Sequence, residues 1–305
     1  MRILCGTDLL PKTSSALDRA GMLARQLDAE LTLLHVVPPG EFEGMLERDM
    51  ERARERLESY AMPPLWQHGA SPQVSVRSGS TAPMLIAMAK TLDAGLVVLG
   101  KHRQRPARDA LAGTLAERLL SELTCPVLIV HRMPWHAYRN VLLALDCSHA
   151  SARAVRAAEA LILAWASRAS VVHAYQPPSE PMMVSAGIAE DVIEGYSTSW
   201  KQRTSAAIAK LLREVSGDSS RYEIILENAT TPEAIQSVVR RLTPDLLVLG
   251  TRGRGRWRRA LLGSVASRML ASAKSDVLVV PDHPPRGRWR NVRADRLNLD
   301  VIPGA

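Results

Sequence analysis

Short apolar runs alternate along the chain with segments that have helical periodicity. Residues 96–99 and 127–130 are apolar throughout, whereas Leu17, Ala20 and Ala24 recur at every third or fourth position. Strands without polar positions are typical of a sheet buried on both faces, and strands that alternate with helices imply right-handed crossovers between parallel strands. The pattern therefore predicts an α/β fold built on parallel strands.

The second half of the chain repeats the first. Asp8 ends the first apolar run, and Asp146 ends a matching run 138 residues later. The next run in each half contains a histidine, and His35 and His173 are again 138 residues apart. Chance similarity would not keep one offset across a strand, a helix and a second strand. We interpret the chain as a duplication, and both histidines as packed core residues rather than ligands.

The offset grows in the later part of each half. The runs at 96–100 and 127–130 recur at 246–250 and 277–280, now 150 residues later. The second half has thus gained about twelve residues, which we interpret as a loop insertion around 176–198. The last run of each half would leave an exposed apolar sheet edge unless something covers it. We therefore expect the two halves to pack against each other as an intramolecular pseudo-dimer.

The duplication predicts two tandem doubly wound domains. Pro134 interrupts the chain after the last apolar run of the first half, which sets the first domain at 1–133 and the second at 138–283. Residues 43–58 have one apolar stripe among charged positions, which predicts a surface helix. Residues 284–305 have no periodicity and many arginines, and we expect a basic tail that is extended or disordered.

Composition limits the possible partners. The 305 residues are 46% hydrophobic and 23% charged, which is ordinary for a globular chain. No apolar run reaches the roughly 18 residues of a membrane-spanning helix, so we expect a cytoplasmic protein without a membrane partner. Three cysteines without metal-ligand spacing predict neither disulfides nor a metal site. The net charge of +8 favours anionic partners such as nucleotides or nucleic acids.

One glycine pattern follows the fourth predicted strand of the second half. Gly250 ends that strand, Gly253 follows two residues further on, and after nine more residues Gly263 and Ser264 begin a helical segment. Glycines allow a ligand to approach the backbone, and free amides at a helix N-terminus favour phosphate. The alternative is that the glycines only make turns and Ser264 only caps the helix. The pattern lacks the lysine of a Walker A loop and does not follow a first strand, which excludes that class and the Rossmann dehydrogenases.

This glycine pattern, an aspartate that ends the first strand and a histidine in the second strand together resemble the universal stress protein family. The resemblance covers both halves and implies, for each, a five-stranded parallel sheet flanked by helices. It also implies ATP at the carboxyl ends of the strands. The matching positions in the second half are Asp146 and Ala174, beside adenine and ribose, and Gly250, Gly253, Gly263, Ser264 and Val265, around ribose and phosphates.

The first half departs from this pattern at one position. Its matching residues are Asp8, Val36, Gly100, Arg103, Gly113 and Thr114. Arg103 stands where the second half has a glycine, and a non-glycine residue at positive φ costs about 1 kcal/mol. We therefore expect an altered or occluded first site, in which Arg103 fills the phosphate space or itself holds an anion.

These features favour a regulatory module for the stress response, with ATP held mainly by the second half. No residue set offers a nucleophile with a base, so no catalytic residue is assigned. Slow hydrolysis would rely on backbone amides, Ser264 and a magnesium ion on the phosphates. The alternatives are an interaction scaffold without nucleotide and a weak adenine-nucleotide hydrolase. Arginine clusters at 252–259 and 286–296 keep nucleic acid as an alternative partner, and further homo-oligomers are compatible with the sequence.

Overall fold

The computed structural model describes residues 1–10, 14–39, 43–61, 71–101, 115–251 and 263–281. The predicted positions Arg103, Gly113, Thr114 and Gly253, both arginine clusters and the basic tail lie outside these ranges. Among the described helices, none has the length and apolar character needed to cross a membrane.

Strands and helices alternate through the first half, as the apolar pattern predicts. The elements are β1 (Arg2–Thr7), α1 (Ser14–Gln26), β2 (Glu30–Val37), α2 (Glu43–Ala61), β3 (Gln73–Ser78), α3 (Thr81–Thr91), β4 (Leu96–Gly100), α4 (Leu115–Glu122) and β5 (Val127–Val130). Helix α2 confirms the predicted surface helix, since Ala53 and Leu57 are buried and Leu46 and Met50 pack against the core.

The second half repeats this order with additional helix. Its elements are β6 (Asn140–Ala144), α5 (His149–Ala158), the π-helix η2 (Glu159–Leu163), β7 (Arg168–Ala174), α6 (Glu180–Ser185), α7 (Glu190–Ser216), β8 (Tyr222–Glu227), α8 (Thr231–Leu242), β9 (Leu246–Gly250), α9 (Ser264–Ser272) and β10 (Asp276–Val280).

The ten strands in the described part of the chain form one sheet, in the order β3-β2-β1-β4-β5-β10-β9-β6-β7-β8. The five strands of each half are parallel to one another, and both halves have the same doubly wound order. The two halves meet where β10 pairs antiparallel with β5, with Val277 beside Ile129 and Val279 beside Val127. This pairing covers the two apolar strands that would otherwise be edges, so the expected intramolecular packing of the halves is confirmed at the level of the sheet.

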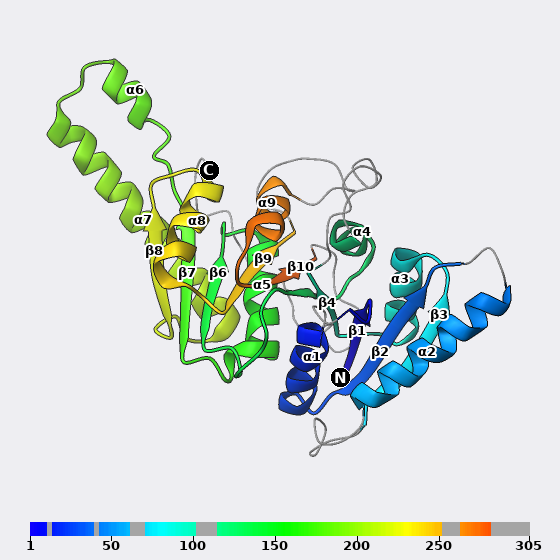
Figure 1. Ribbon diagram of the computed structural model, residues 1–305. Coiled ribbons are helices and arrows are strands. Elements are labelled where there is room, and N and C mark those ends of the chain that lie inside the picture. Colours follow the sequence, from blue (N-terminus) through cyan, green and yellow to red (C-terminus); the bar gives the residue numbers. More distant parts are fainter. Residues whose placement is uncertain (11–13, 40–42, 62–70, 102–114, 252–262, 282–305) are drawn as a thin grey trace.

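Helices cover both faces of the sheet (Figure 1). Ile3 and Cys5 of β1 point into a core shared with α1, α2, α5 and α7, whereas Leu4 points into a second core shared with α3, α4, α8 and α9. Because neighbouring residues of a strand face opposite sides, a strand between two helical layers needs apolar residues at every position. This explains the continuous apolar runs in the sequence.

The expected loop insertion around 176–198 is wrong in kind, because this segment is largely helical. It contains α6 and the N-terminal part of α7, which together form a projection beyond the body of the second half (Figure 1). We call residues 180–203 the arm. The arm is held together by local contacts, since Ser197 Oγ donates to Glu180 Oε2 over 2.9 Å and the rings of Tyr196 and Trp200 lie 6.3 Å apart.

Candidate functional site

The carboxyl ends of β6, β7 and β9 lie side by side at the point where the strand order of the second half reverses. Ala144, near the end of β6, pairs with Val172 on one side and with Leu249 on the other. Asp146 and Gly250, which follow these positions, are thereby brought to one edge of the sheet. In doubly wound sheets, ligands bind in the crevice at this reversal point.

Asp146 is held in one orientation by three hydrogen bonds to the next turn. Its Oδ1 accepts from the Ser148 N–H over 3.1 Å and from Ser151 Oγ over 2.7 Å, while its own N–H donates to Ser151 Oγ over 2.8 Å. The other carboxylate oxygen, Oδ2, is buried without a hydrogen-bond partner among the described residues. A buried acceptor without a donor costs about 1 to 3 kcal/mol, so a ligand that donates a hydrogen bond to Oδ2 would recover this energy.

The backbone turn after Asp146 is repeated in the first half. Cys147 has φ of 59°, and the matching residue Leu9 has φ of 58°, so both adopt the left-handed conformation that side chains other than glycine rarely adopt. Asp8 repeats the hydrogen bond of Asp146, because its Oδ1 accepts from the Leu10 N–H over 3.1 Å. Residues with positive φ cluster at functional sites, where the surroundings hold them in place.

A histidine on the neighbouring strand supports each of these turns. His173 Nδ1 lies 2.6 Å from the Leu145 carbonyl oxygen, and His35 Nδ1 lies 2.8 Å from the matching carbonyl of Thr7. A carbonyl only accepts, so Nδ1 carries the proton in both rings. His173 is buried and His35 is half-buried. Both histidines therefore tie the end of the first strand of their half to the second strand.

Helix α9 directs its first turn toward the same edge of the sheet. The Gly263 N–H donates to the Thr251 carbonyl over 3.0 Å, which holds the start of α9 beside the end of β9. Gly263 is the N-cap residue and has no side-chain oxygen to cap the helix. The amides of Ser264 and Val265 belong to the first turn, where N–H groups have no partner within the helix and the dipole favours an anion.

Tyr175 adds a polar group next to Ala174. Its N–H donates to the Glu227 carbonyl over 3.0 Å, which extends the pairing of β7 with β8 by one residue. Burial, followed by the carboxylates of Glu180 and Glu227, raises the pKa of the Tyr175 phenol. The hydroxyl therefore stays protonated at neutral pH and is available as a hydrogen-bond donor.

The first half brings Asp8, Val36 and Gly100 to its own reversal point. Thr7 pairs with His35, so Asp8 and Val36 come next on the two neighbouring strands, and the last residue of β4, Gly100, pairs with Val130. The surroundings differ from those of the second half. Asp8 is exposed, and Arg56 of α2 donates Nη2–H to the Leu9 carbonyl over 3.1 Å. The Arg56 guanidinium group thus contacts the turn that follows β1.

The arrangement of the second half can bind a ligand by hydrogen bonds. It places Asp146 and Ala174 on neighbouring strands and Gly250, Gly263, Ser264 and Val265 around the end of β9. Sequence reasoning missed Ser151, whose hydroxyl holds Asp146. Its position in the hydroxyl-containing stretch after the aspartate was the available signal. Within the described ranges, no group of three or more His, Cys, Asp and Glu residues is placed to hold a metal ion.

Comparison with known proteins gives one family for both halves. The family model described as the universal stress protein family matches residues 1–131 and 137–281. A universal stress protein of Mycolicibacterium smegmatis is 29% identical over 300 residues, which cover 91% of this chain and 96% of that protein. A universal stress protein of Mycobacterium tuberculosis is 26% identical over 296 residues, which cover 91% and 95%.

Solved structures show the same fold over most of the chain. A universal stress protein from Archaeoglobus fulgidus has a TM-score of 0.64 at 18% identity and covers 92% of this chain and 96% of its own. A Pseudomonas aeruginosa protein of unknown function has a TM-score of 0.58 at 19% identity and covers 92% of each chain. Both likenesses concern the arrangement of helices and strands.

Proposed function

This chain is a tandem member of the universal stress protein family, and from that premise we propose that its second half binds ATP or a related adenine nucleotide and thereby regulates a stress response. Members of the family commonly bind ATP. The observation that carries the proposal for this chain is the unpartnered Oδ2 of Asp146 at the reversal point of the sheet.

The chemistry of an adenine nucleotide matches the donors and acceptors of this edge. The adenine amino group and the ribose hydroxyls donate hydrogen bonds, which a fixed carboxylate such as Asp146 accepts. Phosphate oxygens are acceptors with negative charge, which suits the first-turn amides of Ser264 and Val265 at the start of α9. Asp146 follows the end of β6, and α9 begins beside the end of β9, the strand next to β6, so the two kinds of group lie at one edge of the sheet, as one elongated ligand would need.

In this proposal the protein binds and orients the nucleotide and reports its presence. We propose that bound nucleotide acts through occupancy, and that the Ser151 hydroxyl serves to hold the Asp146 carboxylate in place. A magnesium ion, if bound, would arrive with the phosphates and lower their charge. Slow hydrolysis would be a side reaction, and a single-turnover assay with radiolabelled ATP measures it directly.

Calorimetric titration of the full chain with ATP tests the proposal. Replacing Asp146 with alanine removes a hydrogen bond to a charged group, worth about 1.5 to 3 kcal/mol, so affinity should fall between about tenfold and 150-fold. The matched control is Asp8→Ala in the first half, which should leave the main binding event unchanged. Circular dichroism confirms that both variants fold.

Two outcomes would contradict the proposal. If the parent protein binds neither ATP nor AMP at millimolar concentration, the second half is not a nucleotide site and the scaffold interpretation replaces it. If Asp8→Ala abolishes binding and Asp146→Ala does not, the nucleotide belongs to the first half.

A further inference from the structure

Helices α4 and α9 contact each other across the junction of the two halves. Ser267 of α9 donates its hydroxyl to Glu117 Oε1 of α4 over 3.0 Å. Both helices pack on the same face of the sheet, since Leu119 and Met269 belong to one core (Figure 1). Glu117 and Ser267 are both partly covered by the protein. The first half thus holds a carboxylate against a helix of the second half.

The two residues of this contact occupy equivalent positions of the duplication. Glu117 and Ser267 are 150 residues apart, and in the sheet Leu128 pairs with Leu278 at the same offset. The approximate two-fold axis that relates the halves therefore passes beside both pairs. One residue at the axis is an acid and the other is a neutral hydroxyl. The duplication has thus allowed the two halves to differ here, and only the first half supplies a charge.

Ser267 lies in the first turn of α9, the part of that helix to which the proposed function assigns phosphate. Its N–H donates to the Gly263 carbonyl over 3.0 Å, which closes the turn that contains Ser264 and Val265. Ser267 is about 4.5 Å further along the helix axis than Ser264, and residues three apart lie on the same side of a helix. A phosphate on the first-turn amides would therefore lie within about 10 Å of the Glu117 carboxylate.

At this distance, the carboxylate opposes the attraction of the helix for phosphate. The first turn of α9 contains no acidic residue of its own, so its N–H groups and dipole favour an anion. Two charges about one Debye length apart still interact, especially when one of them is partly covered by protein. The repulsion between Glu117 and a bound phosphate group grows with the negative charge on the phosphate.

We propose that Glu117 is a specificity-determining residue of the nucleotide site in the second half, and that it makes this site discriminate between ligands by their phosphate charge. The inference rests on the proposed function, because it assumes that phosphates lie at the start of α9. The penalty from Glu117 is absent for adenosine, present for AMP and largest for metal-free ATP. Magnesium on the phosphates cancels two of their charges, so the site accepts ATP better as its magnesium complex.

The same contact also has a purely structural interpretation. Glu117 lies in the first turn of α4, where an acid stabilises a helix, and its hydrogen bond to Ser267 joins the two halves. A structural role would change the affinity for every ligand by a similar factor. A charge effect changes the ratio between the affinities for ATP and adenosine. This ratio therefore separates the two roles.

Calorimetric titration of the full chain with adenosine, AMP and ATP tests the proposal, first in EDTA and then with excess magnesium. The variant is Glu117→Gln, which keeps a side-chain oxygen that can accept from Ser267. In EDTA, its affinity for adenosine should equal that of the parent protein, whereas the affinity for AMP should rise about threefold and that for ATP about tenfold. With magnesium, the rise for ATP should be less than about threefold.

Glu122→Gln is the matched control for this variant. Glu122 is at the other end of α4, where it forms an exposed ion pair with Lys90. The substitution changes the net charge of the protein by the same amount as Glu117→Gln. It should leave the ratio between the affinities for ATP and adenosine at the value of the parent protein.

Exchange of the two residues at the axis gives a sharper test. Glu117→Ser alone should raise the affinity for metal-free ATP as Glu117→Gln does. A double variant with Glu117→Ser and Ser267→Glu places the carboxylate at the equivalent position on α9. This exchange should restore the low ratio between the affinities for ATP and adenosine, because a charge again lies beside the first turn of α9.

The possible outcomes separate this inference from the proposed function. If the parent protein binds neither adenosine nor ATP, the proposed function is wrong and the inference is wrong with it. If the parent protein binds both and Glu117→Gln leaves their ratio unchanged, the nucleotide site stands and Glu117 does not determine its specificity. Equal weakening of all three ligands in Glu117→Gln would establish the structural role instead. The same change of ratio in Glu122→Gln would assign the effect to the net charge of the protein and overturn the inference.

Discussion

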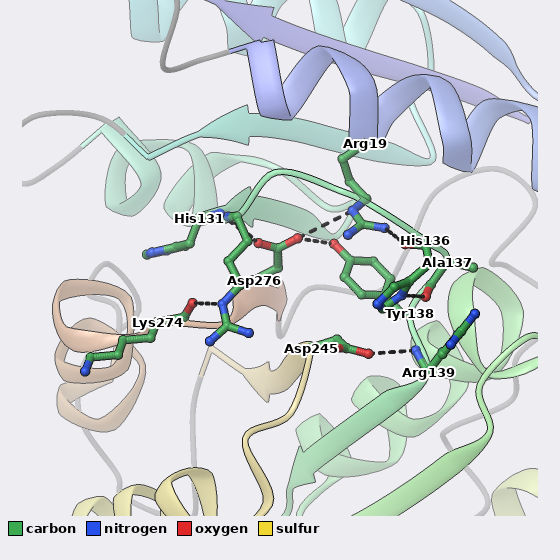
Figure 2. Close-up of polar contacts among 10 residues, drawn as sticks. Arg19, His131, His136, Ala137, Tyr138, Arg139, Asp245, Lys274 and Asp276 are labelled. Carbon is green, nitrogen blue, oxygen red and sulfur yellow. Dashed lines mark hydrogen bonds and ion pairs between the residues drawn. The ribbon is translucent and has the colours of Figure 1, made fainter.

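Arg19 and Asp276 form a buried ion pair across the junction of the two halves, with 3.5 Å between Arg19 Nε and Asp276 Oδ2 (Figure 2). Their side chains are only 6% and 1% exposed. Arg19 belongs to α1 of the first half and Asp276 to the start of β10 in the second, so the pair joins the two halves directly.

The segment that connects the halves is built around this pair. Tyr138 donates its hydroxyl to Asp276 Oδ2 over 2.6 Å, and its ring lies 3.9 Å from the Arg19 guanidinium carbon. The other oxygen of Asp276 accepts from the His131 and Arg132 amides over 2.7 and 3.1 Å. Burial, and then the Asp276 charge, raises the pKa of Tyr138 well above its ordinary value, so the phenol remains a donor.

We predict that Asp276→Asn destabilises the protein by about 3 kcal/mol, because it leaves the Arg19 charge buried without a counterion. Urea unfolding measures this change. Glu122→Gln is the control, since it breaks the exposed pair of Glu122 with Lys90 and should cost less than about 1 kcal/mol. Equal effects of the two substitutions on the free energy of unfolding would show that the buried pair of Arg19 and Asp276 stabilises the protein no more than an exposed ion pair does.

His131 should make stability depend on pH. Burial, and then the charge of Lys101, lowers the pKa of His131 below 6.5, and Asp276 opposes this shift. The unfolded chain therefore binds a proton near pH 6.5 that the folded protein takes up only at lower pH. The contribution of His131 to stability is complete above pH 6.5 and decreases as pH falls below it. Between pH 7 and pH 5, the free energy of unfolding should therefore decrease less in His131→Phe than in the parent protein. Replacement of the exposed His136 by Phe should not reduce this decrease.

The two strand histidines should differ in their effect on stability. His173→Leu leaves the Leu145 carbonyl without its donor, which should cost about 1 to 3 kcal/mol and weaken nucleotide binding, because the Asp146 turn loses its support. His35→Leu removes the matching bond at a half-buried position, where water can replace the donor. We expect a smaller loss there and no change in nucleotide affinity. Thermal unfolding with and without ATP checks both variants, and a larger effect at His35 would contradict this order.

Gly253→Arg should abolish ATP binding, since it gives the second half the residue that Arg103 supplies in the first. The expectation comes from the sequence pattern, and equilibrium dialysis with ATP measures it. Gly255→Arg, two residues further along, provides the matched control for added charge. Undiminished affinity in Gly253→Arg would remove Gly253 from the proposed site.

The duplication, the α/β class and the ends of the strands could be predicted from the sequence. Each rests on local patterns, because a strand between two helical layers must be apolar at every position, and equal offsets carry Asp8 onto Asp146 and His35 onto His173. The orientation of Asp146 could not be predicted, because it depends on where the Ser151 hydroxyl lies after the chain has turned.

Only the tertiary structure decided how the halves are joined and what projects from them. Arg19 and Asp276 are far apart in sequence and have no charged counterparts in the duplicated positions, Ala157 and Pro126. Their pairing arises because β10 runs antiparallel to β5 and brings its start to the side of α1 and the connecting segment. A loop was expected at 176–198 because the offset between the two halves grows there, whereas the helix of the arm is continuous with the part of α7 that packs on the sheet.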